Sequence, residues 1–129
     1  MTTEEFNDWL IDSKKPQPLL LDARSQTEYV VSHIKTAVRI DPVTLDLTAL
    51  STVSKDTPIV VYCSVGYRSA KVAQQLQKKG FSQISNLSGG LFQWANEERP
   101  IFKDDEQPTQ LVHPYDEIWG KLLKTSYHA

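Results

Sequence analysis

The fold of this protein is decided by one stretch of sequence, PIVVYCSVGYRSAKVAQQL, at residues 58–76. Its apolar run, Ile59–Tyr62, predicts a buried strand, and apolar residues recur at helical spacing after Ser69. Cys63, the only cysteine in the 129 residues, lies between the two. The sequence thus predicts a thiol at the junction of a strand and a helix, where parallel α/β folds gather functional groups.

Strand and helix patterns alternate along the rest of the chain as well. Short apolar runs predict three further strands, and amphipathic or capped segments predict helices between them. The expected strands lie at 19–21, 37–40 and 84–87, and the other expected helices begin at Thr2 or Thr3, at Ser25 and at Leu91. This order predicts a parallel sheet with helices on both of its faces.

Composition and charge exclude several classes of function. Fourteen Lys and Arg against sixteen Asp and Glu give a net charge of −2, so no nucleic acid or anionic membrane is expected as a partner. No apolar run reaches the roughly 18 residues of a membrane span, and the acidic start MTTEEFNDWL does not resemble a signal peptide, so a cytoplasmic location is expected. Three histidines and one cysteine lack metal-ligand spacing, so neither a metal nor another cofactor is expected.

The residues after Cys63 favour a reactive thiol over a buried apolar one. A thiol attacks as its thiolate, which positive potential stabilises, and a loop that enters a helix supplies backbone N–H groups and the helix dipole. Gly66 allows the loop to curl, Arg68 adds a cation, and Ser69 either caps the helix or donates to the sulfur. The alternative is that Cys63 is a small hydrophobic residue at a strand end, as most free cysteines are.

Three ordered motifs resemble those of a known family. They are LLLDARSQTEYVVSHI at 19–34, IVVYCSVGYRSAKVAQQL at 59–76 and FSQISNLSGGLFQW at 81–94. The sequence resembles a single-domain rhodanese-like sulfurtransferase over about residues 4–98. The resemblance implies a three-layer α/β/α rhodanese-like fold with a four- or five-stranded parallel sheet, since the first strand usual in the family has little room before the first helix.

The resemblance also implies a persulfide mechanism. Cys63 would take sulfane sulfur from a donor, such as thiosulfate or a protein persulfide, and pass it to an external thiol or cyanide. Cys63 and Arg68 are the expected catalytic residues, and the substrate-binding residues are Ser64, Val65, Gly66, Tyr67 and Ser69. Because there is no second cysteine, the acceptor must come from another molecule.

Loop length separates this prediction from a phosphatase of the same fold. The related cell-cycle phosphatases resemble C-x5-R, whereas four residues separate Cys63 from Arg68 here. The shorter loop favours a single sulfur atom over a tetrahedral phosphate. Ser64 and Val65 add no cation to the loop. A neutral or protein-bound sulfur donor is therefore an alternative to dianionic thiosulfate as the expected substrate.

Three polar residues outside the loop are expected to support the site rather than to react. Asp22 is expected to bond loop amides or a nearby arginine, and Arg24 to pair with Glu28 four residues later. His33 is expected to be a packing and hydrogen-bonding residue, with a catalytic Cys–His dyad as the alternative. The family's "GHI-x-GA" reads SHIKTA at 32–37, without either glycine, which leaves the geometry of this turn open.

The last residues differ in character from the rest. We expect a rhodanese-like domain at 1–100 and a C-terminal extension at 101–129, with a linker, KDDEQPTQ, and a short helix, HPYDEIWGKLLK. Its apolar residues, among them Trp119, Leu122 and Leu123, either dock on the parent domain or bind a protein partner. The second hypothesis for function is therefore a catalytically weak binding or regulatory module that uses this extension.

Overall fold

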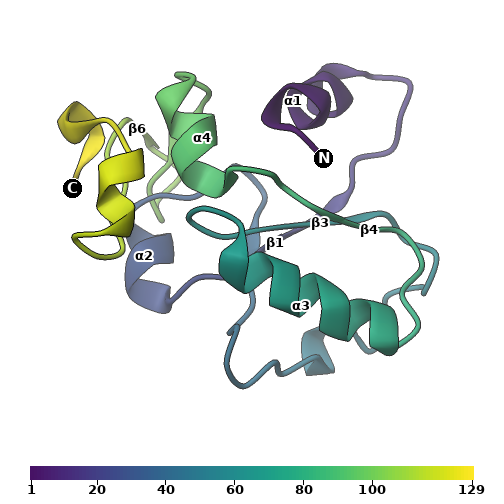
Figure 1. Cartoon of the computed structure of the whole chain (residues 1–129). Coiled ribbons are helices and arrows are strands. Elements are labelled where there is room, and N and C mark those ends of the chain that lie inside the picture. Colours follow the sequence, from purple (N-terminus) through teal and green to yellow (C-terminus); the bar gives the residue numbers. More distant parts are fainter.

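A parallel four-stranded sheet forms the centre of the protein, in a computed structural model that describes all residues, 1–129 (Figure 1). The strands lie in the order β2-β1-β3-β4. Their bounds are β1 Leu19–Asp22, β2 Val38–Arg39, β3 Ile59–Tyr62 and β4 Ile84–Asn86. The helices are α1 Thr3–Ile11, α2 Gln26–Val31, α3 Tyr67–Lys78 and α4 Gly90–Asn96, and a 3-10 turn, η1, spans Thr48–Leu50. The predicted three-layer α/β fold is confirmed, with four strands.

Alternate residues of the central strands face two separate apolar clusters, as the two faces of a sheet require. On one face, Leu20 and Val60 pack with Phe6 of α1 and Trp94 of α4. On the other face, Val61 packs with residues of α3 and η1. All four residues of β3 are buried, because this strand lies inside the sheet and both of its faces are covered.

The N-terminus joins the free edge of the sheet without forming a strand. The carbonyl of Met1 accepts a hydrogen bond from the N–H of Ser88 at 2.8 Å, and the terminal amine donates to the carbonyl of Asn86 at 3.2 Å. Thr2 then caps α1 in a reciprocal pair with Glu5. Helix α1 therefore follows Thr2 directly. None of the helices has both the length and the apolar character needed to cross a bilayer.

The segment expected to be a linker and a helix has a different local structure. Residues 101–109 form a hairpin of two short strands, β5 Ile101–Phe102 and β6 Pro108–Thr109, and 3-10 turns follow at Trp119–Leu122 (η2) and Thr125–Tyr127 (η3). Of the short helix predicted at 113–124, only Trp119–Leu122 is helical, as a 3-10 helix. Tyr115 adopts a left-handed φ of 69°, which an α-helix does not tolerate.

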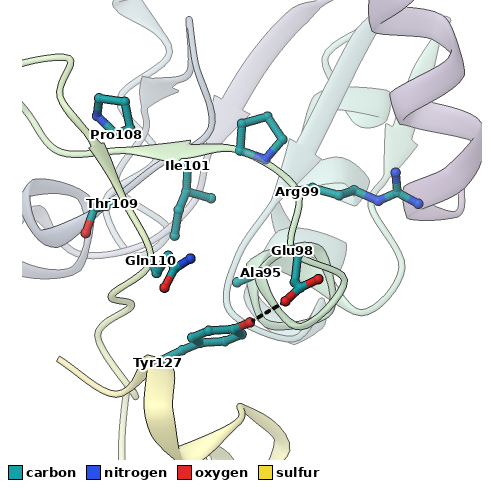
Figure 2. A pocket seen from close by; sticks show the side chains of 9 residues that line it. Ala95, Glu98, Arg99, Ile101, Pro108, Thr109, Gln110 and Tyr127 are labelled. Atoms are coloured by element: carbon teal, nitrogen blue, oxygen red, sulfur yellow. Dashed lines mark hydrogen bonds between the residues drawn. The ribbon is translucent and has the colours of Figure 1, made fainter.

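The C-terminal extension packs on the same core as the rest of the chain. Ile101, Val112, Leu123 and Tyr127 are buried and belong to the cluster that contains Phe6 and Trp94. Figure 2 shows Tyr127 pointing toward Glu98, to which its hydroxyl donates at 3.4 Å, beside a hollow of about 240 Å³. The division at residue 100 stays a prediction, but these contacts join the extension to the domain.

Candidate active site

Cys63 lies at the carboxyl end of β3, with its sulfur at the base of the loop that leads into α3. The N–H of Gly66 points at Sγ with a donor–sulfur distance of 3.0 Å. Gly66 is the N-cap of α3 and has a φ of 114°, which side chains disfavour, so glycine makes this turn possible. The sequence prediction of a thiol facing a helix N-terminus is therefore confirmed in its geometry.

Ser69 and Asn86 form the wall behind the sulfur. Ser69 Oγ lies 3.4 Å from Sγ and 2.6 Å from Asn86 Oδ1, and Asn86 Nδ2 donates to the carbonyl of Gly66 at 3.1 Å. Of the two roles expected for Ser69, the structure shows the contact with sulfur and no side-chain cap. Asn86 was not predicted, although a polar residue at the carboxyl end of a parallel strand marks the edge where sites form.

Helix α4 holds the loop from its other side. The N–H of Leu91 donates to the carbonyl of Cys63 at 2.8 Å, and that of Phe92 donates to Ser64 at 3.0 Å. Gly90 permits this approach, since a Cβ at that position would lie 2.5 Å from the carbonyl oxygen of Cys63. Its φ is 58°, so both space and backbone conformation require glycine.

Substitution of Gly90 by alanine is expected to destabilise the protein by about 2 kcal/mol, because both a backbone contact and a left-handed conformation oppose the new methyl group. Urea denaturation followed by circular dichroism measures the effect. Gly80→Ala is the matched control: its φ is 100°, but the nearest atom that a Cβ would meet is a lysine side-chain carbon at 3.9 Å. Equal losses in the two variants would show that the contact with Cys63 has no effect.

Arg68 binds Glu28 of α2 rather than pointing freely into the loop. Its Nη1 and Nη2 donate to Oε1 and Oε2 at 2.7 and 2.8 Å, and Nη2 also donates to Ser64 Oγ at 2.9 Å. Burial raises the pKa of Glu28, but the hydrogen bonds and charge of Arg68 outweigh it and lower that pKa to about 2. The expected pair of Arg24 with Glu28 is therefore wrong, because Glu28 turns toward the loop.

Asp22 and Arg24 form a separate buried ion pair below the site. Arg24 donates from Nε and Nη2 to the two carboxylate oxygens at 2.8 and 2.7 Å, and Nη2 also donates to the carbonyl of Ser32 at 2.6 Å. Tyr62 donates to Asp22 at 2.6 Å and accepts from the N–H of Ile34. Burial and the Asp22 charge hold the pKa of Tyr62 well above its usual range. This network ties β1 and β3 to the turn after α2.

His33 is buried and lies flat on the ring of Tyr29. The two ring centroids are 4.1 Å apart with an angle of 5° between the planes, and Nδ1 lies 3.0 Å from the carbonyl of Tyr29. The backbone N–H and carbonyl of His33 pair with Phe102 of β5. Its contacts thus run to α2 and to the extension, in keeping with a packing role; that role and those of Asp22 and Arg24 stay predictions.

A pocket of about 230 Å³ lies beside Cys63, which is itself buried. Four loop residues line it with Cys63, and two aromatic residues of the extension complete it; the lining is Cys63, Ser64, Val65, Tyr67, Arg68, Tyr115 and Trp119. The ring of Tyr115 covers the guanidinium of Arg68, with 4.1 Å between Cζ and the ring centroid. The spacing of apolar residues predicts Trp119 as part of an apolar surface, but nothing in that spacing connects either aromatic residue to Cys63.

Comparison with known proteins agrees with this geometry. Residues 2–97 match the family described as "Rhodanese-like domain". The chain is 33% identical over 101 residues to the "Probable adenylyltransferase/sulfurtransferase MoeZ" of Mycobacterium tuberculosis, covering 78% of this chain and 25% of that protein. It is 34% identical over 83 residues to a "Sulfurtransferase" of Allochromatium vinosum, covering 64% and 77%.

A comparison with solved structures also finds a sulfurtransferase. The structure of "Thiosulfate sulfurtransferase from Pseudomonas aeruginosa" superposes with a TM-score of 0.70 at 28% identity, covering 81% of this chain and 20% of that chain. The chain thus spans about a quarter of the length of the mycobacterial relative and about three quarters of that of the Allochromatium protein. The match over most of its residues shows that the chain belongs to the rhodanese-like domain family.

Proposed function

We propose that this protein is a sulfurtransferase that carries sulfane sulfur as a persulfide on Cys63. Relatives named sulfurtransferases support a general role in sulfur transfer. The single observation that carries the proposal is the position of Sγ, which accepts the N–H of Gly66 at 3.0 Å at the N-terminus of α3. An N–H and a helix dipole directed at one point stabilise an anionic sulfur.

The reaction takes two displacements. The Cys63 thiolate attacks the outer sulfur of thiosulfate or of a persulfide; the bond from that sulfur to the rest of the donor breaks, and the leaving group takes the electron pair. The product, Cys63–S–S⁻, lies among the amides of residues 64–68. An external thiolate or cyanide then attacks the outer sulfur and releases the Cys63 thiolate, so no other oxidant or reductant is required.

Incubation with a sulfur donor is expected to add one sulfur atom, about 32 Da, to the wild-type protein and none to Cys63→Ser. Intact-mass spectrometry measures the gain after treatment with thiosulfate, mercaptopyruvate or a persulfide-bearing cysteine desulfurase. A thiol reductant should then remove the added mass. Absence of the gain with every donor would refute the proposal, and a gain in Cys63→Ser would place the sulfur elsewhere.

The proposed location is the cytoplasm, where a lone thiol stays reduced.

A second proposal, a binding module, is supported by the extension, where the side chains of Ile118 and Leu122 are 74% and 56% exposed. The two proposals differ at Cys63. A binding module keeps its partner in Cys63→Ser and shows no turnover in the wild type, whereas the sulfurtransferase loses its activity in that variant.

A further inference from the structure

The pocket beside Cys63 differs from the rest of the loop in the chemistry of its walls. The N–H of Gly66 faces the sulfur, but the upper wall consists of Val65 and the rings of Tyr67, Tyr115 and Trp119. Tyr115 and Trp119 come from the C-terminal extension and are about 40% exposed. Two half-exposed aromatic rings beside a proposed nucleophile form a surface on which an apolar group can be buried.

The side chains of the pocket offer no unbalanced positive charge. Both terminal nitrogens of the Arg68 guanidinium, Nη1 and Nη2, donate to the two carboxylate oxygens of Glu28, at 2.7 and 2.8 Å. The ring of Tyr115 covers the face of the guanidinium. Lys71 does not line the pocket, and its amine lies 4.6 Å from the centroid of the Tyr67 ring. A small dianion would leave water for a site whose only lining guanidinium is already neutralised, which is unfavourable.

The size of the pocket suits an organic group. Its volume of about 230 Å³ exceeds the roughly 150 Å³ of an apolar protein cavity that takes up benzene. One aromatic ring together with a sulfane sulfur therefore fits between the extension and the base of the loop. The walls would contact the ring while the N–H of Gly66 faces the reacting sulfur.

From these observations we infer that Tyr115 and Trp119 select the substrate: the pocket takes an organic sulfane-sulfur donor with an aromatic or branched apolar group in preference to a small inorganic dianion. The inference rests on the proposed sulfur transfer at Cys63. With an aromatic thiosulfonate, Ar–SO2–S⁻, the Cys63 thiolate bonds to the outer sulfur while the bond between the two sulfurs of the donor breaks. The sulfinate Ar–SO2⁻ leaves with the electron pair, and two negative charges are present before and after.

Two thiosulfonates of equal charge test the selection directly. Benzenethiosulfonate and methanethiosulfonate differ in the ring, so the ratio of their kcat/KM values reports the contact with the apolar wall. We expect the wild type to prefer the aromatic donor and Trp119→Ala to lower that ratio about 3- to 10-fold, the range given by loss of one aromatic contact. Trp119→Phe should restore most of the ratio.

Ile118→Ala is the matched control, since this neighbour of Trp119 is 74% exposed and does not line the pocket. It should leave the ratio unchanged, and thermal denaturation checks that every variant is folded. A wild type with no preference for the aromatic donor, or a Trp119→Ala variant with an unchanged ratio, would overturn the inference.

A binding measurement separates failure of the inference from failure of the proposed function. Calorimetric titration of Cys63→Ser with benzenesulfinate and methanesulfinate requires no sulfur transfer. Tighter binding of the aromatic sulfinate, lost in Cys63→Ser/Trp119→Ala, would support the pocket even if no donor loads Cys63, which would refute only the sulfurtransferase proposal. Equal binding of the two sulfinates would overturn the inference even if Cys63 accepts sulfur.

Discussion

A chain truncated after Arg99 is expected to lose its cooperative fold. The deletion removes four buried side chains of the main core, Ile101, Val112, Leu123 and Tyr127. Each contributes about 1.5–3 kcal/mol by burial, so their sum approaches the 5–15 kcal/mol that stabilises a typical domain. Near-ultraviolet circular dichroism and urea denaturation of the truncated chain should show an early, broad transition or none.

Point variants of the full chain make this prediction quantitative. Leu123→Ala is expected to cost about 2–4 kcal/mol as a core cavity, whereas Leu122→Ala, whose side chain is 56% exposed, should cost less than about 0.5 kcal/mol. A truncated chain that unfolds at the wild-type urea concentration would contradict the prediction. It would also show that residues 1–99 form an independent unit.

Replacement of Arg68 by alanine is expected to cost about 3–5 kcal/mol of folding stability, because it leaves the Glu28 carboxylate buried without its cation. The Glu28 side chain is 3% exposed and retains only the hydroxyls of Ser25 and Ser64 as side-chain donors. The same variant should reduce sulfur transfer by about 100-fold under conditions where it is folded, because Ser64 and the loop lose an anchoring charge. Urea denaturation and single-turnover transfer measure the two effects.

A second ion pair provides the control. Arg99 and Glu97 are 21% and 32% exposed, so Arg99→Ala should cost less than about 1 kcal/mol. Loss of stability in Arg68→Ala without loss of transfer would show that Arg68 acts only in folding. Full stability in Arg68→Ala would contradict the role of the buried pair.

The pair also gives the stability a defined pH dependence. The pKa of Glu28 falls from 4.5 to about 2 on folding, so its contribution is fully present above about pH 5 and is lost as the pH falls toward 2. A shift of this size corresponds to about 3 kcal/mol. The difference in unfolding free energy between the wild type and Glu28→Gln should therefore be constant from pH 6 to 8 and shrink between pH 5 and 2. A difference independent of pH would exclude the ionised carboxylate as its source.

The layers of the fold could be predicted from the sequence because local patterns determine them. The uninterrupted apolar run Ile59–Tyr62 requires burial on both faces, and Gly66 marks the turn into α3. The extension could not be predicted in the same way. Its apolar residues have helical spacing, but Leu123 enters the core while Trp119 lines the pocket, and these contacts depend on surfaces formed by distant parts of the chain.

The candidate site shows the same division between local and distant contacts. Cys63, Gly66 and Ser69 lie within seven consecutive residues, so their proximity follows from one strand–loop–helix unit. The partner of Arg68 lies forty positions away, and sequence spacing favoured the nearer Arg24 as the partner of Glu28 instead. Asn86 and Tyr115 reach the loop only after the sheet and the extension are assembled; the position of Asn86 at a strand end marks the edge of the sheet, but no local pattern gives its contact with Ser69 or identifies Tyr115.

The attachment of the loop between two helices has a consequence for redesign. Its backbone is fixed at the carbonyl of Gly66 by α3 and at the carbonyls of Cys63 and Ser64 by α4, and the side chain of Arg68 is held by the carboxylate of Glu28. None of these attachments uses the side chains of Tyr67 or Trp119, which face the pocket. The part of the protein that holds the sulfur and the part that contacts the rest of the donor are thus separable, so a mutational library limited to the pocket wall can be screened for new donors on an unchanged nucleophile.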